Sequence, residues 1–135
     1  MLIEDIIALV LADNTVTGLI ASRFYSGPVL PRGYTLPAAL LHAVTDATDY
    51  TFSGSSPLNE ANVQLDVYGD TEAAVKSIQS AIRAVLENYK GTTGSTKVDA
   101  TLWKSDGDMP FSADINKAGI GYRVMSRLCF YYEAV

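Results

Sequence analysis

The chain contains one histidine and one cysteine, the residue types that most often serve in acid–base or nucleophilic catalysis. His42 lies inside the apolar run Ala38–Thr45, and no known catalytic motif surrounds it. Cys129 stands between Leu128 and Phe130, without a basic neighbour in sequence to stabilise a thiolate. We therefore expect both side chains to be structural and the protein not to be an enzyme.

Other short motifs are also poor matches to known sites. The segment 91–97, Gly-Thr-Thr-Gly-Ser-Thr-Lys, faintly resembles a phosphate-binding loop, but its spacing is wrong and it leads from a helix into a strand. Asp106 and Asp108 with Asp114 lack the remaining ligands of a calcium loop. Two carboxylate pairs have no spacing that fixes their geometry: Glu60 with Asp66, and Asp46 with Asp49. The sequence predicts no catalytic residue, no cofactor and no metal site.

Two arginines near the C-terminus are more informative. Arg123 and Arg127 share one face of the last predicted strand with Tyr131. One interpretation is a solvated face on which the arginines pair with Asp66 or Asp99 of neighbouring strands. The other is a subunit interface, where arginine and tyrosine are enriched. The candidate subunit or partner interface comprises Arg123, Arg127, Tyr131, Asp106, Asp108, Met109, Phe111 and Asp114.

The composition is that of one folded domain spanning residues 1–135, with 48% hydrophobic and 19% charged residues. A net charge of −5 and the absence of a lysine or arginine cluster argue against tight DNA binding. A single cysteine excludes an internal disulfide and suits a reducing compartment. Glu4 and Asp5 stand where a secretory signal would carry basic residues, and no stretch is long and apolar enough for a membrane span.

The stretch 63–91 organises the predicted fold. Val63, Leu65 and Val67 alternate with polar residues, which predicts a half-buried strand. We expect Asp70 to cap the following amphipathic helix and Gly91 to end it. The helix's apolar stripe comprises Val75, Ile78, Ile82, Val85 and Tyr89, widened by Ala74, Ala81 and Leu86. The residues expected to face outward are Lys76, Gln79, Arg83, Glu87 and Asn88.

Helical spacing, alternation and breaker residues predict the remaining elements. The expected helices are Leu2–Ala12 and a short turn at Val16–Ala21, and the expected strands are Arg23–Tyr25, Ala38–Thr45 with Thr48–Phe52, Val98–Trp103 and Ile120–Glu133. The expected irregular segments are 26–37, 53–57, 92–95 and a mobile loop or arm at 106–118. Val98, Ala100 and Leu102 are expected to share one face. These elements predict an α+β fold with a mainly antiparallel sheet, an N-terminal helix and one long amphipathic helix against it.

The strand Val63–Tyr68, followed by the alanine-rich helix to Leu86, is the most specific part of a pattern that covers nearly the whole chain. The other parts of this pattern are the helix ending Leu11-Ala12-Asp13, Val16, the segment 23–28 with Pro31 and Pro37, Asp49-Tyr50 before Gly54, and the strand from Tyr122-Arg123 to Phe130–Glu133. This layout resembles that of the tail-completion or tail-terminator proteins of long-tailed phages. The predicted segment 106–118 is longer than the typical connection.

The resemblance implies a virion protein that forms a homo-oligomeric ring, expected to have six copies, on the head-proximal end of the tail tube. Such a ring terminates tube polymerisation and provides the head-to-tail joining surface, so its partners would be the tail tube protein and a head-completion or stopper protein. DNA would pass through without specific binding, and assembly would take place in the host cytoplasm. We expect the acidic segment Asp106–Asp114 to face the lumen or a partner. The alternatives are a head-completion or stopper neck protein, or a small bacterial α+β enzyme or ligand-binding domain with His42 near a pocket.

Overall fold

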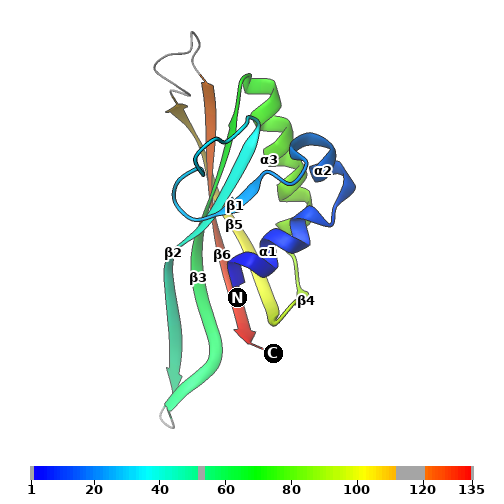
Figure 1. Ribbon diagram of the computed structural model, residues 1–135. Coiled ribbons are helices and arrows are strands. Elements are labelled where there is room, and N and C mark those ends of the chain that lie inside the picture. The colour runs from blue at the N-terminus through cyan, green and yellow to red at the C-terminus, as the bar shows by residue number, and fades with distance from the viewer. Residues whose placement is uncertain (1, 52–53, 112–120, 135) are drawn as a thin grey trace.

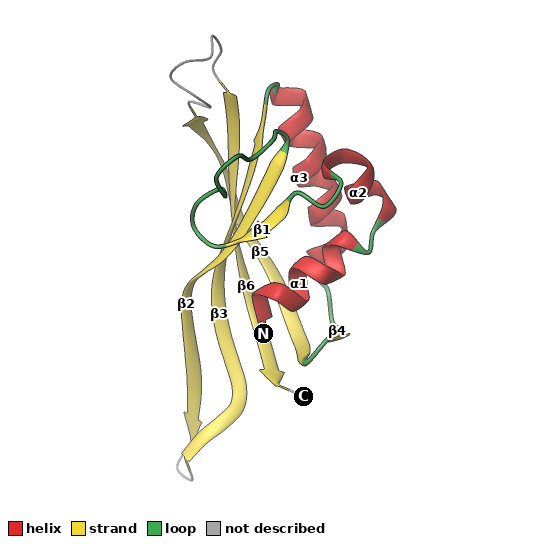
Figure 2. Cartoon of the chain, in the orientation of Figure 1, coloured by secondary structure: helices red, strands yellow, loops and turns green. Residues whose placement is uncertain are grey.

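A computed structural model describes residues 2–51, 54–111 and 121–134 (Figures 1 and 2). The elements in chain order are α1 (Leu2–Leu11), α2 (Asn14–Ile20), β1 (Phe24–Ser26), β2 (Ala38–Thr51), β3 (Gly54–Gly69), α3 (Glu72–Leu86), β4 (Gly91–Thr93), β5 (Thr96–Phe111) and β6 (Gly121–Ala134). The predicted α+β class is confirmed. No helix in the described residues is long and apolar enough to cross a membrane.

The six strands form one sheet in the order β1-β2-β3-β6-β5-β4. All neighbours are antiparallel except β1 and β2, which run parallel. The central pair, β3 and β6, comes from segments far apart in sequence, and Val67 lies opposite Val124. The short strands β1 and β4 pair with only part of their neighbours, so among the described residues most of β2 and β5 has no strand on its outer side.

The three helices cover one face of the sheet, and the core lies between them (Figure 2). Alternation explains why β3 buries Val63, Leu65 and Val67 against the helices, as predicted. The core residues of the helices are Leu2, Ile6, Val10, Val16, Ile20, Val75, Ile78, Ile82 and Leu86. The opposite face carries no helix and is called the open face below.

Helix α3 differs from its prediction at both ends. Thr71, not Asp70, is the N-cap, and its hydroxyl accepts a hydrogen bond from the amide of Ala74 at 3.1 Å. The helix ends at Leu86, well before Gly91, which instead begins β4. Glu87 is the C-cap and already has extended backbone, and Asn88 after it adopts a positive φ of 62°, so the chain turns away from the helix without using a glycine.

Strand β5 is longer than expected, and its side chains face the two sides of the sheet in a different order from the predicted one. Residues 106–111, predicted as part of a loop or arm, form the end of this strand, and 112–120 lie outside the described residues. Register shifts between Val98 and Ala100 and between Trp103 and Ser105 interrupt the alternation. Val98 and Thr101 are therefore buried, whereas Leu102 is 44% exposed, against the expectation that it shares a face with Val98.

Strands β2 and β3 form a long hairpin that projects past the rest of the sheet (Figure 1). The segment 53–57 was predicted as a loop, but β3 already begins at Gly54. Among the side chains that the structure describes, residues 42–47 and 58–60 do not belong to the core. We call residues 45–60 the projecting hairpin.

Candidate interface surfaces

An ion pair lies on the open face, where β3 and β6 pair. Arg123 Nη2 and Nε lie 3.0 and 3.1 Å from Oδ1 of Asp66, which is buried, and the guanidinium lies over the ring of Tyr68 at 5.4 Å from its centroid. Gln64 donates to both oxygens of the same carboxylate, at 3.2 and 3.0 Å. Burial raises the pKa of Tyr68. The predicted pairing of Arg123 with Asp66 is therefore present, and it links two central strands of the sheet.

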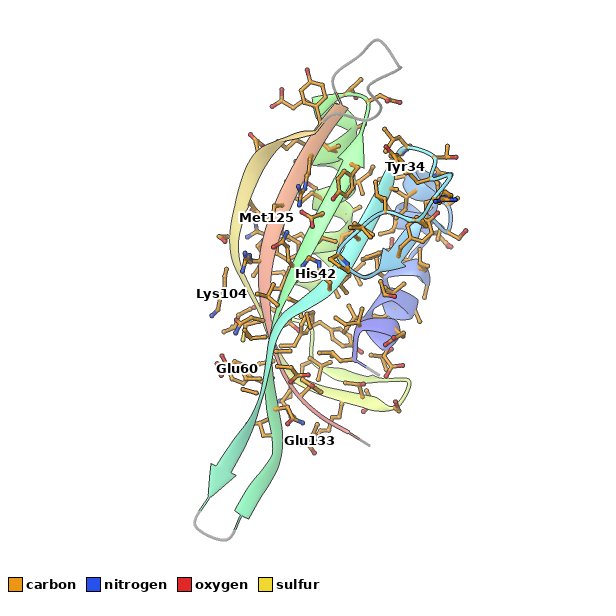
Figure 3. All side chains as sticks on the ribbon, turned by 60° about the vertical axis from the view of Figure 1, so that its left-hand side comes forward. Tyr34, His42, Glu60, Lys104, Met125 and Glu133 are labelled. Carbon is orange, nitrogen blue, oxygen red and sulfur yellow. The ribbon has the colours of Figure 1, made fainter. Side chains whose placement is uncertain are left out.

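The rest of the open face includes half-buried and exposed side chains (Figure 3), although Leu40 and Cys129 on the same face are buried. Arg127 and Tyr131 lie on the same face as Arg123, as predicted, because every second residue of β6 points to that face. Within the described part of the chain, neither Arg127 nor Lys104 forms an ion pair. Met125 and Leu102 add apolar surface to the same face. Arg127 and Tyr131 remain interface candidates.

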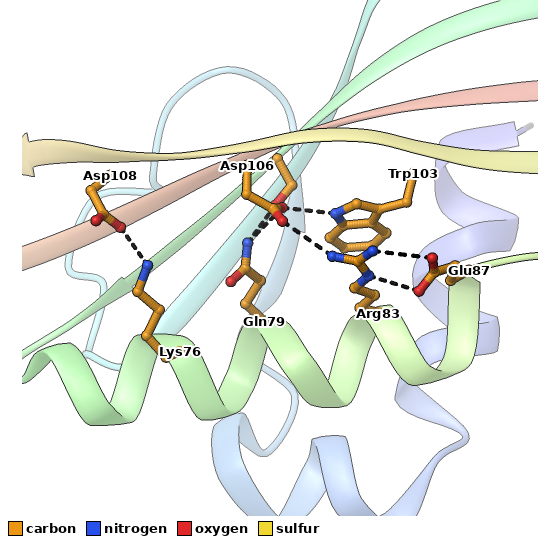
Figure 4. A network of polar contacts seen from close by, with 8 residues as sticks. Lys76, Gln79, Arg83, Glu87, Trp103, Asp106 and Asp108 are labelled. Carbon is orange, nitrogen blue, oxygen red and sulfur yellow. Dashed lines mark hydrogen bonds and ion pairs between the residues drawn. The ribbon is translucent and has the colours of Figure 1, made fainter.

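Asp106 has a different setting from the one predicted (Figure 4). Its Oδ1 accepts hydrogen bonds from Trp103 Nε1 at 2.7 Å, Ser126 Oγ at 2.7 Å and Gln79 Nε2 at 2.8 Å. Its Oδ2 lies 3.2 Å from Arg83 Nη1. This carboxylate therefore joins β5 and β6 to α3. Gln79 was expected to face outward. It is almost completely buried, and its side-chain amide donates hydrogen bonds to Asp106 and Ser126.

Three further contacts lie on this side of the sheet (Figure 4). Arg83 stacks over Trp103 at 5.3 Å from the ring centroid and binds Glu87 at 2.7 Å. Asp108 binds Lys76 at 2.6 Å, so it also contacts α3. Asp106 and Asp108 thus both bind within the subunit, on the face of the sheet that carries the helices. Of the remaining predicted interface residues, Met109 and Phe111 lie in β5 with side chains outside the described part, and Asp114 lies outside the described residues.

Asp5 forms a contact that the sequence did not predict. Its carboxylate accepts hydrogen bonds from the hydroxyl of Thr96 at 2.7 Å and from the amide and hydroxyl of Ser95, both at 3.2 Å. The Thr96 bond is the main reason why the pKa of Asp5 is lowered. This contact joins α1 to the turn between β4 and β5, and about ninety residues of chain separate the partners. No local pattern could have revealed it.

The possible catalytic residues do not form a catalytic arrangement. Cys129 is buried, and burial together with the nearby carboxylate of Glu60 raises the pKa of its thiol, the opposite of thiolate activation. His42 is half-buried, and its Nδ1 has no hydrogen-bond partner in the described structure. Among residues 2–51, 54–111 and 121–134, no three His, Cys, Asp or Glu side chains come together as possible metal ligands.

A groove of about 610 Å³ lies on the helix side of the sheet, and its lining runs from Leu41 and Asp46 of β2 to Tyr132 of β6 and Thr96 of β5. The start of α1 also lines it, through Leu2, Ile3 and Glu4. Glu4 and Asp46 are its acidic lining residues, and Asp46 accepts a hydrogen bond from the hydroxyl of Tyr132 at 2.6 Å. Burial and this bond raise the pKa of Tyr132. We call this feature the β2 groove.

No protein-family model matches the chain, and no curated protein matches its sequence. The fold is similar to that of a chain in a solved structure described as the virion of a native gene transfer agent particle. That similarity has a TM-score of 0.65 and covers 94% of this chain and 93% of that chain, at 14% sequence identity. The two chains therefore share a fold over nearly their whole length.

Proposed function

We propose that this protein is a structural subunit of a phage-like virion, forming a ring at the head-proximal end of the tail tube. The observation that carries the proposal is the full-length similarity in fold to a chain of a gene transfer agent virion. The ring would stop tube polymerisation and provide the surface to which the filled head binds. Its partners would be further copies of itself, the tube protein and a head-completion protein, with DNA passing through without specific binding.

The distribution of contacts supports an assembly role. The clusters of charged groups around Asp66 and Asp106 bind within the subunit and hold the sheet and α3 together. The open face, the β2 groove and the projecting hairpin remain available to other molecules. A ring subunit needs separate surfaces for its neighbours and for its axial partners, and these three features can supply them.

Deletion of the gene from its phage or prophage tests the proposal, with tail length and head attachment scored by electron microscopy. A terminator predicts overlong tails beside unattached, filled heads. Tails of normal length that fail to join heads would instead indicate a head-completion or stopper protein. Unchanged infectious particles would contradict the structural role.

A complementation control addresses the enzyme alternative. A plasmid that supplies the wild-type protein should restore tail length and infectivity, and one that supplies His42→Ala should do so equally well. Failure of a correctly folded His42→Ala protein would indicate chemistry at His42 instead.

A further inference from the structure

The middle of the open face is uncovered on its β5 side. Met125 and Arg127 of β6 lie opposite Gly107 and Ser105 of β5, so their neighbours on that strand are small. A Cβ atom added to Gly107 would meet no other atom within 4 Å, which indicates open space beside Met125. Leu102, farther along β5, is 44% exposed. We call Leu102, Lys104, Met125 and Arg127 the open-face patch.

The open-face patch carries two cations without anionic partners. Arg127 is half-buried and Lys104 is exposed, and neither forms an ion pair with another described residue. Asp106 and Asp108 belong to the same strand as Lys104, but their carboxylates bind α3 on the helix side of the sheet. Cations beside apolar side chains favour a partner that combines negative charge with apolar surface.

Acids on or beside the open face do not satisfy this requirement within the subunit. The carboxylate of Asp66 binds Arg123. Lys97 lies 3.7 Å from Asp99 and 3.8 Å from Glu133. These three acids already have cationic partners, so the charges of the open-face patch remain to be matched by another molecule.

The projecting hairpin has the opposite charge. Residues 45–60 contain three acidic residues and no lysine or arginine. Asp46 and Ala47 are exposed, and none of the described side chains of this segment belongs to the core. The hairpin also extends past the rest of the sheet, so it can reach a second copy (Figure 1).

Resting on the proposed ring, we propose that the projecting hairpin of each copy lies across the open-face patch of its neighbour. Acidic side chains of the hairpin then approach Arg127 and Lys104, and the hairpin covers Leu102 and Met125. The two surfaces differ, so the contact is heterologous, and such contacts close into rings when the rotation permits. Two open-face patches facing each other would instead bring like charges together, which disfavours that arrangement.

Cysteine cross-linking on assembled rings tests this contact directly. Ala47→Cys and Leu102→Cys are made in two separate proteins, one of them ¹⁵N-labelled, and the two are mixed before assembly. Cys129 stays in place because it is buried, and wild-type rings control for its reaction. We expect a short bismaleimide to join the two introduced cysteines, and the mass of the product identifies a link between copies.

The matched control replaces Leu102→Cys by Ser77→Cys, because Ser77 is also exposed but lies on α3, on the other side of the sheet. Ala47→Cys should give no product with it. Rings without the link between positions 47 and 102, or with an equal link between 47 and 77, would overturn the inference while the proposed function stands. Links that join Leu102→Cys only to itself would do the same, because they indicate two open faces in contact.

Charge reversal provides a second, independent test, with folding checked by urea denaturation. Arg127→Glu should weaken self-association about tenfold, and Arg127→Lys should keep most of it. Lys90→Glu is the matched control, because Lys90 is also a cation without an ion pair among the described residues but lies between α3 and β4. Equal effects of Arg127→Glu and Lys90→Glu would contradict the contact. If the wild-type protein forms no ring, alone or on tails, then the proposed function itself fails.

Discussion

Asp106 is the residue that joins most parts of the structure. Four donors from β5, β6 and α3 approach its two oxygens: Trp103, Ser126, Gln79 and Arg83. In Asp106→Asn, an amide NH2 group replaces one carboxylate oxygen. This group is itself a donor, and it would face one or more of the four donors. We expect a loss of about 1–3 kcal/mol in the free energy of unfolding, measured by urea denaturation.

The matched control for Asp106 is Asp108→Asn, which removes the exposed contact with Lys76. We expect this variant to lose at most about 1 kcal/mol, because solvent-exposed pairs contribute little. Equal losses in the two variants would show that Asp106 is no more important than a surface ion pair.

The contact of Asp5 predicts a pH dependence. The hydroxyl of Thr96 holds the pKa of Asp5 below its usual value of 3.8. A lowered carboxyl pKa stabilises the fold above the unfolded pKa, and this contribution disappears as the pH falls through the folded pKa. Between about pH 4 and pH 2, the urea midpoint should therefore fall less steeply for Asp5→Asn than for wild type.

At the residue scale, the sequence predicted contacts within the sheet better than contacts between layers. Arg123 could be matched to Asp66 because both were assigned to neighbouring strands, on faces set by alternation. The partners of Asp106 could not be predicted, since they depend on how α3 packs against a strand that was expected to be a loop. Gln79 was wrongly predicted to face outward for the same reason, since its partners Asp106 and Ser126 could not be identified. A polar side chain can be buried when it forms hydrogen bonds, as Gln79 does.

At the element scale, the start of α3 provides a direct comparison between a predicted and an observed cap. Thr71 occupies the N-cap, and its hydroxyl accepts from the amide of Ala74. Thr71→Ala should therefore lower the free energy of unfolding by about 1 kcal/mol, and Asp70→Ala should change it less. Thermal or urea unfolding of the two variants measures the difference, and the reverse order would support the original expectation for Asp70.

Regular alternation made β3 and β6 predictable, whereas β5 was only partly recognised. A strand is visible in sequence when one face is consistently apolar. The register shifts around Asp99 and Lys104 break that pattern, and Gly107 and Pro110 read as breakers. Pairing with β6 nevertheless continues to Phe111, because tertiary contacts override weak local preferences.

At the scale of the whole molecule, the projecting hairpin allows a test of folding apart from assembly. Replacement of residues 49–58 by Asn-Gly, a favourable two-residue turn, would join the paired residues Thr48 and Asn59 directly. Because the described residues on both sides of this segment, 45–47 and 59–60, lie outside the core, we expect the free energy of unfolding to change by less than about 1 kcal/mol. Under the proposed function, the shortened protein should not restore infectivity to a phage that lacks the gene.

Urea denaturation of the shortened protein, measured alongside complementation, is the control that shows whether the protein still folds. Full infectivity with a stable, shortened protein would show that the outer hairpin is dispensable for virion assembly. A large loss of stability would contradict the separation of this segment from the core.

The contact between Asp5 and the Ser95–Thr96 turn has a consequence for synthesis on the ribosome. The ribosome makes helix α1 about ninety residues before the turn that binds it. The pairing of β3 with β6 likewise joins distant parts of the chain. A fold with such a high contact order is expected to form slowly. Until the last strands emerge, the apolar side of α1 has no complete core to join, so the nascent chain depends on protection from aggregation for most of its synthesis.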